Sequence, residues 1–161
     1  MFKCQMELFL FCDGSARNNG RVGAKAGFGV HICNGNTTIH QHSAAIPGHE
    51  PQTNQRAELR ALEYVIRYIA DGGHVGAKIY TDSKYSIDVL TKWCEGWERK
   101  GWRKADGKPV LHQDIIQPMW IQWKKIRLVT NIVHVPSHTG GLDFASQGNA
   151  EADRLATAAT T

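Results

Sequence analysis

The segment QRAELRALEYVI, residues 55–66, predicts a helix in which one residue is out of place. At about 100° per residue, Leu62, Val65 and Ile69 fall within about 40° of Glu58, so this acid lies in the middle of the apolar face. A carboxylate that faces a core costs on the order of several kcal/mol unless a partner neutralises it. Periodicity alone therefore makes Glu58 a misplaced charge, and a partner for it has to be sought elsewhere in the chain. The other charged residues fall on the opposite side of the helix: Arg56, Arg60, Glu63 and Arg67.

The composition is that of one ordinary globular domain. The chain has 161 residues, of which 42% are hydrophobic and 21% charged, and a chain of this length can bury a core and fold alone. No apolar run approaches the roughly 18 residues of a membrane-spanning helix. The start, MFKCQMELFLFCDG, has no small-residue cleavage site and predicts a first strand rather than a signal peptide. We expect a single domain, residues 1–161, that is monomeric when isolated.

The cysteines and histidines give little sign of a metal or disulfide framework. Four cysteines are widely spaced without a C-x-x-C motif, which favours small buried thiols in an intracellular reducing compartment. His40 and His42 alternate along a predicted strand, but no cysteine or further histidine lies at a spacing suited to zinc.

Periodicity and turn residues predict a mixed α/β sheet. A strand–loop–strand–turn–strand start is followed by alternating helices and strands, which indicates an antiparallel trio joined to a parallel part, with helices on the faces. Thr53 is expected to cap the first helix, Gly72-Gly73 to end it, and Pro118 to lie in or near the first turn of a later one. SARNNGRVGAKAG and SHTGGLDFASQG are predicted to be loops. The predicted strands are 6–13, 28–33, 37–46, 77–82 and 130–135, and the predicted helices are 53–70, 83–93, 115–126 and 149–159.

Acidic residues stand where these elements would converge. Asp13 is expected to end the first strand and Asp82 the fourth, so the two meet if these strands are parallel neighbours. Glu58 would approach from the helix that crosses both strands, and Asp153 on the last helix is a candidate fourth member. Taken singly, Asp13 before a glycine could be a turn residue and Asp82 before a serine could be a helix cap.

Clustered carboxylates require protons or cations. An all-oxygen set favours Mg²⁺ or Mn²⁺ over zinc, because these hard ions prefer oxygen ligands. Two such ions about 3.5–4 Å apart suit phosphoryl transfer, in which one activates water and the other stabilises the leaving oxygen.

A basic segment follows the second predicted helix. Between Lys92 and Lys108 there are six basic residues against three acids, and Trp93, Trp97 and Trp102 are interleaved with them. This pattern suits a phosphate backbone; the alternative is a solvated helical hairpin whose tryptophans belong to the core.

The whole set of motifs resembles the ribonuclease H type 1 family. DGS at 13–15, TNQRAEL at 53–59, YTDS at 80–83, SHTGG at 137–141 and GNAEADRLA at 148–156 occur in the family's order across essentially the whole chain. The resemblance implies a ribonuclease H-like fold with a five-stranded mixed sheet of order 3-2-1-4-5. It also implies a Mg²⁺-dependent endonuclease that cuts the RNA strand of RNA–DNA hybrids through two ions, with Mn²⁺ as a substitute, and leaves 5′-phosphate and 3′-hydroxyl ends.

The resemblance also implies roles for individual residues. Asp13 is similar to the carboxylate shared by both ions, Asp153 to the ligand on the water-activating side, and Glu58 and Asp82 to the ligands on the leaving-group side. His138, beside Gly140 and Gly141, resembles a mobile histidine that assists proton transfer or product release. The expected substrate contacts are Asn19, Asn54 and Gln55 to the RNA, Thr53 and Trp97 to a DNA-strand phosphate, and Lys100, Arg103 and Lys104 in a basic handle at about 93–110. Trp93 and Trp102 are expected to be packing residues.

Several positions depart from the family pattern. Ser137 stands where glycine is usual before the histidine, and Pro51 stands where an arginine is common. Ala105 and His112 occupy pocket positions where small polar groups are usual, so affinity for the DNA strand is expected to differ. The long loop between His138 and Asp153 is similar to retroviral domains. The chain could therefore be free-standing, or a domain tethered to a reverse transcriptase polymerase and carried in a virion.

Two other functions would use the same kind of fold. A non-catalytic nucleic-acid-binding module would be expected to lose one or more of the four acids, and all four are present. A transposase or integrase core would act on duplex DNA, which the DGS and TNQRAEL stretches and the handle argue against.

Overall fold

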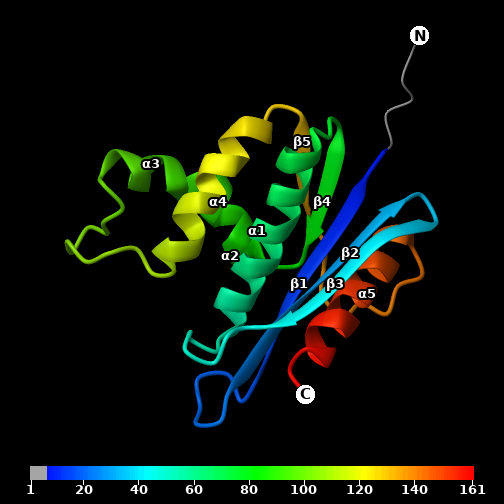
Figure 1. Ribbon diagram of the computed structural model, residues 1–161, viewed down its shortest axis with the longest axis horizontal. Helices are drawn as coiled ribbons and strands as arrows, with labels where there is room; N and C mark the ends of the chain where they lie inside the picture. Colours follow the sequence, from blue (N-terminus) through cyan, green and yellow to red (C-terminus); the bar gives the residue numbers. More distant parts are fainter. Residues whose placement is uncertain (1–6) are drawn as a thin grey trace.

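The computed structural model describes residues 7–161, which form one sheet with helices on both faces (Figure 1). The strands are β1 (Phe9–Arg17), β2 (Lys25–Asn34), β3 (Thr37–Ala45), β4 (Ala77–Thr81) and β5 (Thr130–His134). The helices are α1 (Asn54–Gly72), α2 (Lys84–Asp88), α3 (Cys94–Arg99), α4 (Gln113–Ile126) and α5 (Phe144–Ala158), and a π-helical segment η1 (Val89–Trp93) joins α2 to α3.

The strand order is β3-β2-β1-β4-β5, which confirms the predicted sheet. β2 pairs antiparallel with both β1 and β3, while β4 pairs parallel with both β1 and β5. A bend at Asn34–Asn36, with Gly35 in the left-handed region at φ 57°, closes the predicted hairpin between β2 and β3. α1 covers one face of the sheet, with α4 packed against α1, and α5 covers the other face (Figure 1).

The two faces of β1 belong to two cores. Leu10 and Cys12 are buried toward α1 in the main cluster, whereas Phe11 is buried toward α5 with Ala152. This alternation is the period of two that a strand imposes on its side chains. Asp13, the next odd-numbered residue, therefore points to the same side as Phe11, toward α5.

The two largest boundary errors have different causes, a long-range partner strand for β1 and a local cap for α5. β1 does not end at Asp13 but continues to Arg17, because β2 pairs with it along its whole length. α5 begins at Phe144 rather than at residue 149, because the side chain of Asp143 accepts a hydrogen bond from the Ser146 backbone N–H and caps the helix. The beginning of the predicted first strand, residue 6, lies outside the described residues, as does Cys4.

Two predicted helices also differ in detail. Pro118 lies inside α4 rather than in its first turn, so the helix lacks the hydrogen bond that a backbone N–H at this position would donate. The single helix predicted for residues 83–93 is α2, capped by Ser83, followed by the wider η1 turn.

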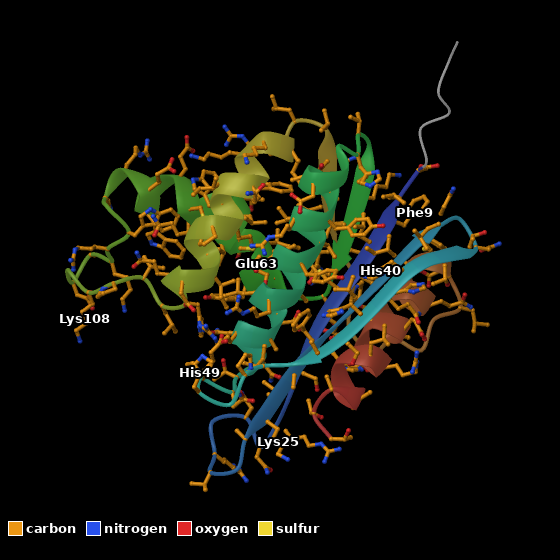
Figure 2. The ribbon with its side chains drawn as sticks, in the orientation of Figure 1. Phe9, Lys25, His40, His49, Glu63 and Lys108 are labelled. Carbon is orange, nitrogen blue, oxygen red and sulfur yellow. The ribbon has the colours of Figure 1, made fainter. Side chains whose placement is uncertain are left out.

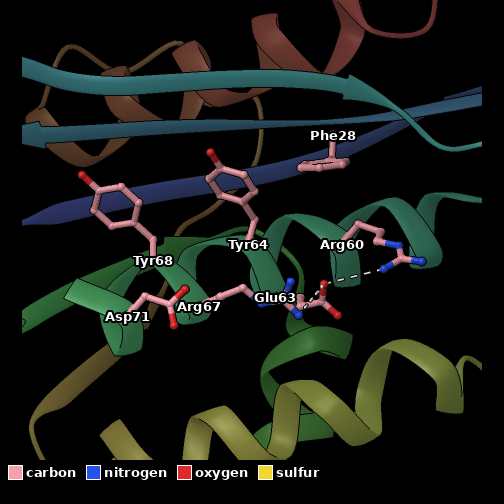
Figure 3. A pocket seen from close by; sticks show the side chains of 7 residues that line it. All are labelled: Phe28, Arg60, Glu63, Tyr64, Arg67, Tyr68 and Asp71. Atoms are coloured by element: carbon pink, nitrogen blue, oxygen red, sulfur yellow. Dashed lines mark ion pairs between the residues drawn. The ribbon is translucent and has the colours of Figure 1, made fainter. Parts of the chain in front are cut away.

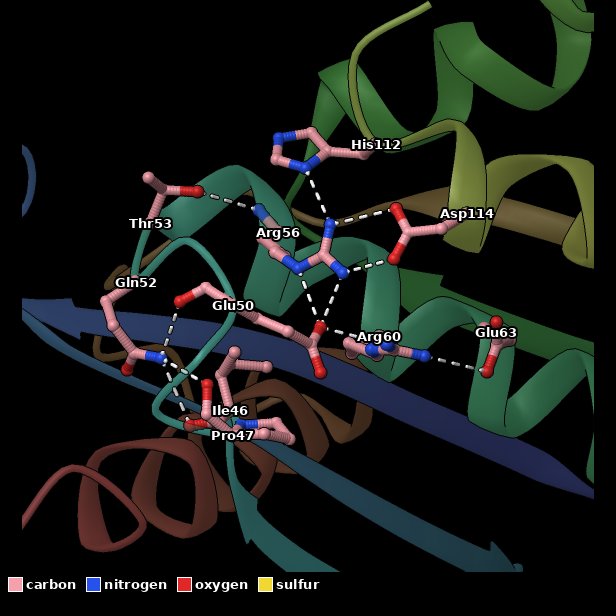
Figure 4. Close-up of polar contacts among 10 residues, drawn as sticks. All are labelled: Ile46, Pro47, Glu50, Gln52, Thr53, Arg56, Arg60, Glu63, His112 and Asp114. Carbon is pink, nitrogen blue, oxygen red and sulfur yellow. Dashed lines mark hydrogen bonds and ion pairs between the residues drawn. The ribbon is translucent and has the colours of Figure 1, made fainter.

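Arg56 is buried, contrary to the expectation that it lies on a solvated face. The side chain is 4% exposed and joins α1 to α4 and to the preceding loop (Figure 4). Its guanidinium donates to the carboxylates of Glu50 and Asp114 and, at 3.2 Å, to Nδ1 of His112. The part of α1 that bears Arg56 is therefore covered by an ion-pair cluster and by α4.

None of the helices formed by residues 7–161 combines the length and the apolar character that a membrane crossing requires.

Candidate active site

Three carboxylates meet where β1 and β4 separate. Asp13 lies within β1, Asp82 directly follows β4, and Glu58 reaches in from α1; one oxygen from each lies within 4.8 Å of the others. The parallel ladder between the two strands ends at the pair Phe11 and Tyr80. Beyond this pair the two strands separate. Asp13 lies two residues after Phe11 and Asp82 two residues after Tyr80, so both carboxylates are at the gap between the strands. Sites at the carboxyl ends of parallel strands are usually built in this way.

Gly14 allows α1 to approach β1 closely enough for Glu58 to reach Asp13. A Cβ atom at residue 14 would lie 2.6 Å from the carbonyl carbon of Ala57 and closer still to the backbone nitrogen of Glu58. Both neighbours are backbone atoms, so neither can turn away. The glycine of the DGS motif is thus explained by a helix–strand contact rather than by a turn.

Replacing Gly14 by alanine is expected to displace α1 from β1. Overpacking of this kind destabilises a fold by about 1–3 kcal/mol, and a displacement of about 1 Å at a catalytic site lowers the rate by about 10²-fold. Urea denaturation and the cleavage rate proposed below would measure the two effects. Gly48→Ala is the matched control, because a Cβ atom there meets nothing within 4 Å; equal behaviour of the two variants would contradict the account.

The cluster lacks a cationic side chain. No ion pair among residues 7–161 involves Asp13, Glu58 or Asp82, and Oε2 of Glu58 is buried without a hydrogen-bond partner. Burial and the neighbouring Glu58 raise the pKa of Asp13 to about 11. Burial, together with the charge of Asp82, raises the pKa of Glu58 to about 8. The oxygen set and its unpaired atom therefore fit a divalent cation.

These pKa values predict how stability depends on pH. The pKa of Glu58 is about 8 in the fold but about 4.3 in an unfolded chain. Its contribution is therefore complete below about pH 4 and is lost as the pH rises through about 8. In EDTA, the melting temperature should fall between pH 5.5 and pH 8.5, and saturating Mg²⁺ should reduce this fall. Glu58→Gln should flatten the EDTA profile; an EDTA profile that rises toward pH 8.5 in the wild type would contradict the assignment.

Asp153 and His138 border the same cavity. The cavity has a volume of about 380 Å³ and is open to solvent; besides the three acids it is lined by Gly14, Ser15, Asn54, Ser137, His138, Asp153 and Thr157. Asp153 comes from α5 and stands outside the 4.8 Å cluster, but its side chain helps to raise the pKa of Asp13. His138 is exposed on the loop between β5 and α5, in the left-handed region at φ 51°.

The predicted RNA contacts lie at the rim of this cavity. Asn54 begins α1, and its backbone N–H donates to Oδ1 of Asn19 at 3.1 Å, which ties the β1–β2 loop to the helix start. Thr53 caps α1 by accepting from the Arg56 backbone N–H. Gln55 is exposed beside them. Of the three predicted RNA contacts, Asn54 lines the cavity, and Thr53, predicted to contact the DNA strand, precedes it in the chain.

The handle residues are not brought next to the carboxylates. Trp97 is half-buried against the main core, with its ring 5.8 Å from that of Trp93, while Lys100, Arg103 and Lys104 are exposed. Trp102 is buried and packs as predicted, whereas Trp93 is 38% exposed.

The departures from the family pattern divide into exposed and buried positions. Pro51, Ala105 and Ser137 are exposed. His112 is buried, and burial together with Arg56 lowers its pKa. Because a guanidinium only donates, Nδ1 of His112 is an acceptor, and the neutral ring carries its proton on Nε2.

One polar residue near the site was missed by the sequence patterns. Asn149 is 5% exposed, and its Oδ1 has no partner among the described residues. It lines a small cavity of about 70 Å³ together with His138, Ser146 and Asp153. Asn149 lies four residues, or about one helical turn, before Asp153 and on the buried side of α5. This spacing from a predicted site residue could have identified Asn149 in the sequence.

A second hollow lies along α1 but is remote from this chemistry. It has a volume of about 390 Å³ and is lined by Phe28, Arg60, Glu63, Tyr64, Arg67, Tyr68 and Asp71 (Figure 3). At about 100° per residue these helix positions centre roughly opposite Glu58. Glu63 forms ion pairs of 3.6 Å with Arg60 and Arg67, so the charges are largely neutralised within the hollow.

Comparison with known proteins identifies relatives of the whole described chain. The family model described as RNase H matches residues 5–161. The probable ribonuclease H of Acanthamoeba polyphaga mimivirus is 38% identical over 89% of this chain and 62% of its own length. Ribonuclease H1 of Mus musculus is 35% identical over 92% of this chain and 48% of its own length. The chain thus spans about half to two thirds of these relatives.

A solved structure has the same arrangement of elements. A chain of the foamy viral protease-reverse transcriptase, solved in complex with dsDNA, aligns with a TM-score of 0.79 at 26% sequence identity. The alignment covers 96% of this chain and 94% of that one.

Proposed function

Because the chain belongs to the ribonuclease H family, we propose that it hydrolyses the RNA strand of RNA–DNA hybrids as an endonuclease. The products would carry 5′-phosphate and 3′-hydroxyl ends. The observation that carries the proposal is the convergence of Asp13, Glu58 and Asp82 within 4.8 Å at an open cavity. We infer that residues 1–161 form a single catalytic domain, because the described residues share one sheet.

We propose two Mg²⁺ ions as the cofactors, with Mn²⁺ as a substitute. Asp13 would contribute to both ions, Asp153 to the water side, and Glu58 and Asp82 to the leaving-group side. When bound, the ions would activate the attacking water and stabilise the leaving oxygen of an in-line displacement. The set fits because its donors are all oxygens, one of them is buried without a partner, and no cationic side chain of residues 7–161 pairs with the cluster.

We propose that His138 transfers a proton at the mouth of the cavity or assists product release. Its imidazole is exposed on a loop that borders both the main cavity and the small cavity beside Asn149. An imidazole can both accept and donate a proton, and Gly140 in the same loop adopts the left-handed conformation that glycine allows, at φ 66°. His138 would therefore transfer a proton during cleavage or assist product release.

Substrate choice would rest on the two sides of the cavity. Asn19, Asn54 and Gln55 supply donors and acceptors able to read 2′-hydroxyls, which distinguish RNA from DNA. Thr53 and Trp97 would contact a phosphate of the DNA strand. The exposed cations of the handle, Lys100, Arg103 and Lys104, would add ionic contacts to the backbone.

The experiment that tests this function is cleavage of a hybrid of defined sequence in Mg²⁺. The wild type should cut only the RNA strand, and end-labelling should reveal 3′-hydroxyl and 5′-phosphate ends. Duplex DNA of the same sequence is the control and should remain intact. Cleavage of the DNA duplex, or binding of the hybrid without turnover in Mg²⁺ or Mn²⁺, would overturn the proposal.

A further inference from the structure

The β1–β2 hairpin carries positive charge that the proposed site does not use. No aspartate or glutamate occurs between Asp13 and Glu50, whereas Arg17, Arg21 and Lys25 all lie in this interval. Arg17 ends β1, Lys25 begins β2, and Arg21 lies in the turn between them. All three are exposed. The hairpin therefore presents cations without any local acid to neutralise them.

Arg17 and Lys25 are direct cross-strand partners, which the fold itself does not favour. The register of β1 and β2 places the two residues opposite each other. Like charges in this position destabilise an antiparallel pair. Neither residue, nor Arg21, takes part in an ion pair among residues 7–161. A ligand with negative charge would explain why two cations face each other here.

The hairpin is aligned with the catalytic cavity. Asp13, Ser15 and Arg17 alternate along β1 and so lie on one face of it, and the first two line the cavity. Four residues of a strand cover about 13 Å at roughly 3.3 Å per residue. The hydrogen bond from the Asn54 backbone to Asn19 fixes the hairpin loop beside the start of α1. α5 packs on this face at Gly27 and Gly29 of β2, so the open route follows the edge of β1 that β4 leaves unpaired beyond Phe11. A backbone that follows this edge past Asp13 would meet Arg17 and then Lys25.

The hairpin and the handle reach substrate from different directions. Figure 2 shows Lys25 at the hairpin and Lys108 at the tip of the loop between α3 and α4, well apart on the molecule. The start of α1, which bears Asn54, lies between these two segments (Figure 1). A duplex bound by the handle and crossing the cavity would therefore reach the hairpin on the far side of the cavity rim.

We propose that the β1–β2 hairpin, residues 17–25, is a second phosphate-binding arm. Arg17 and Lys25 contact the RNA strand's backbone a few nucleotides from the bond that is cut. The RNA strand is assigned because the two cations share the face of Asp13; the assignment rests on the function proposed above. Each neutralised phosphate releases condensed counterions, so the arm contributes to affinity in a salt-dependent way.

The experiment compares the salt dependence of hybrid binding in two double variants. Arg17→Gln/Lys25→Gln removes the arm, and Lys125→Gln/Arg127→Gln removes equal charge at the end of α4, which precedes β5 at the opposite end of the sheet. A fluorescein-labelled hybrid is titrated without divalent cations, at 50 to 200 mM NaCl. Each phosphate contact contributes about 0.9 to the slope of log association constant against log salt concentration. The arm variant lacks two contacts, so its slope should be less steep than the wild type's by about 1.8. Its loss of affinity between 50 and 200 mM NaCl should therefore be about 12-fold smaller.

Two further readouts separate the arm from a structural role and locate the contact. Removing the like-charge pair should leave the melting temperature equal or higher, and kcat at saturating hybrid within about twofold of wild type. Single neutral methylphosphonate linkages, moved along each strand in turn, should weaken wild-type binding at RNA positions where the arm variant is insensitive.

Several results would overturn the proposal that the β1–β2 hairpin binds phosphates. These are a slope equal to that of the Lys125/Arg127 control, a lower melting temperature that accounts for weaker binding, or sensitive linkages confined to the DNA strand. Failure of the wild type to cut the hybrid would instead refute the proposed function, and the slopes would still decide whether the hairpin binds phosphates.

Discussion

Replacing Asp13 by asparagine should lower the rate of hybrid cleavage by at least about 10³-fold while stabilising the metal-free protein. A 10³-fold loss corresponds to about 4 kcal/mol of transition-state stabilisation, which fits the removal of the carboxylate nearest the centre of the cluster. Asparagine has almost the same shape, so the site would keep its geometry but lose the charge that holds the cations. Single-turnover cleavage in Mg²⁺ measures the first effect.

The gain in stability follows from the same burial. Asp13 is 3% exposed among two other acids, and its pKa is raised to about 11. In the metal-free fold at neutral pH, Asp13 must therefore hold a proton that it would release in the unfolded chain, and a neutral amide removes this cost. The melting temperature in EDTA at pH 7.5 should therefore rise, and Mg²⁺ should no longer increase it. Asp71→Asn, an exposed acid on α1, is the control and should change neither quantity; a variant of Asp13 that cleaves normally would refute the metal assignment.

Replacing Arg56 by methionine should lower the free energy of unfolding by about 3 kcal/mol. The guanidinium is 4% exposed and neutralises Glu50, which is itself 12% exposed. Breaking a buried ion pair by removing one partner costs about 3–5 kcal/mol, because the other charge stays buried. We expect about 3 kcal/mol, the lower end, because Asp114 is 61% exposed and Glu50 keeps an ion pair of 2.9 Å with Arg60. Urea denaturation measures the change in the free energy of unfolding.

Arg67→Met is the matched control for this prediction. Arg67 lies on the same helix, is 54% exposed and pairs with Glu63 at 3.6 Å. Exposed pairs contribute at most about 1 kcal/mol, so this variant should unfold close to the wild-type midpoint. Equal losses in the two variants would show that the cluster around Arg56 does not hold α1 to α4.

The features predicted correctly from sequence depend on short-range patterns. The helical period placed Glu58 on the apolar face of α1, and strand–turn signals indicated the β2–β3 hairpin. The strand order 3-2-1-4-5 followed from the resemblance of the motifs to a known family. The places of Asp13 and Asp82 at predicted strand ends indicated that the two acids could meet, and their meeting with Glu58 depends on the parallel pairing of β1 with β4.

The features that were missed depend on contacts between distant segments. β1 extends beyond Asp13 because β2 pairs with it, and no local signal marks that partner. Arg56 is buried because α4 and the loop bearing Glu50 close over the polar side of α1. Gly14 reads as a turn residue in sequence, but the approach of α1 is what requires it. Helical or strand period identifies a face, and only the tertiary fold determines what covers that face.

The most direct test of the central claim is single-turnover cleavage of an RNA–DNA hybrid by the wild type and by Asp82→Asn. Asp82 directly follows β4 and is one of the three clustered carboxylates. Asparagine has nearly the same size as aspartate but carries no negative charge, so the substitution removes a proposed cation ligand and keeps the side-chain volume. The wild type should cut the RNA strand in Mg²⁺ and stop when EDTA is added, while the variant should lose at least about 10²-fold in rate, or about 2.7 kcal/mol. A variant that cuts as fast as the wild type, or a wild type that cuts equally well in EDTA, would contradict the account.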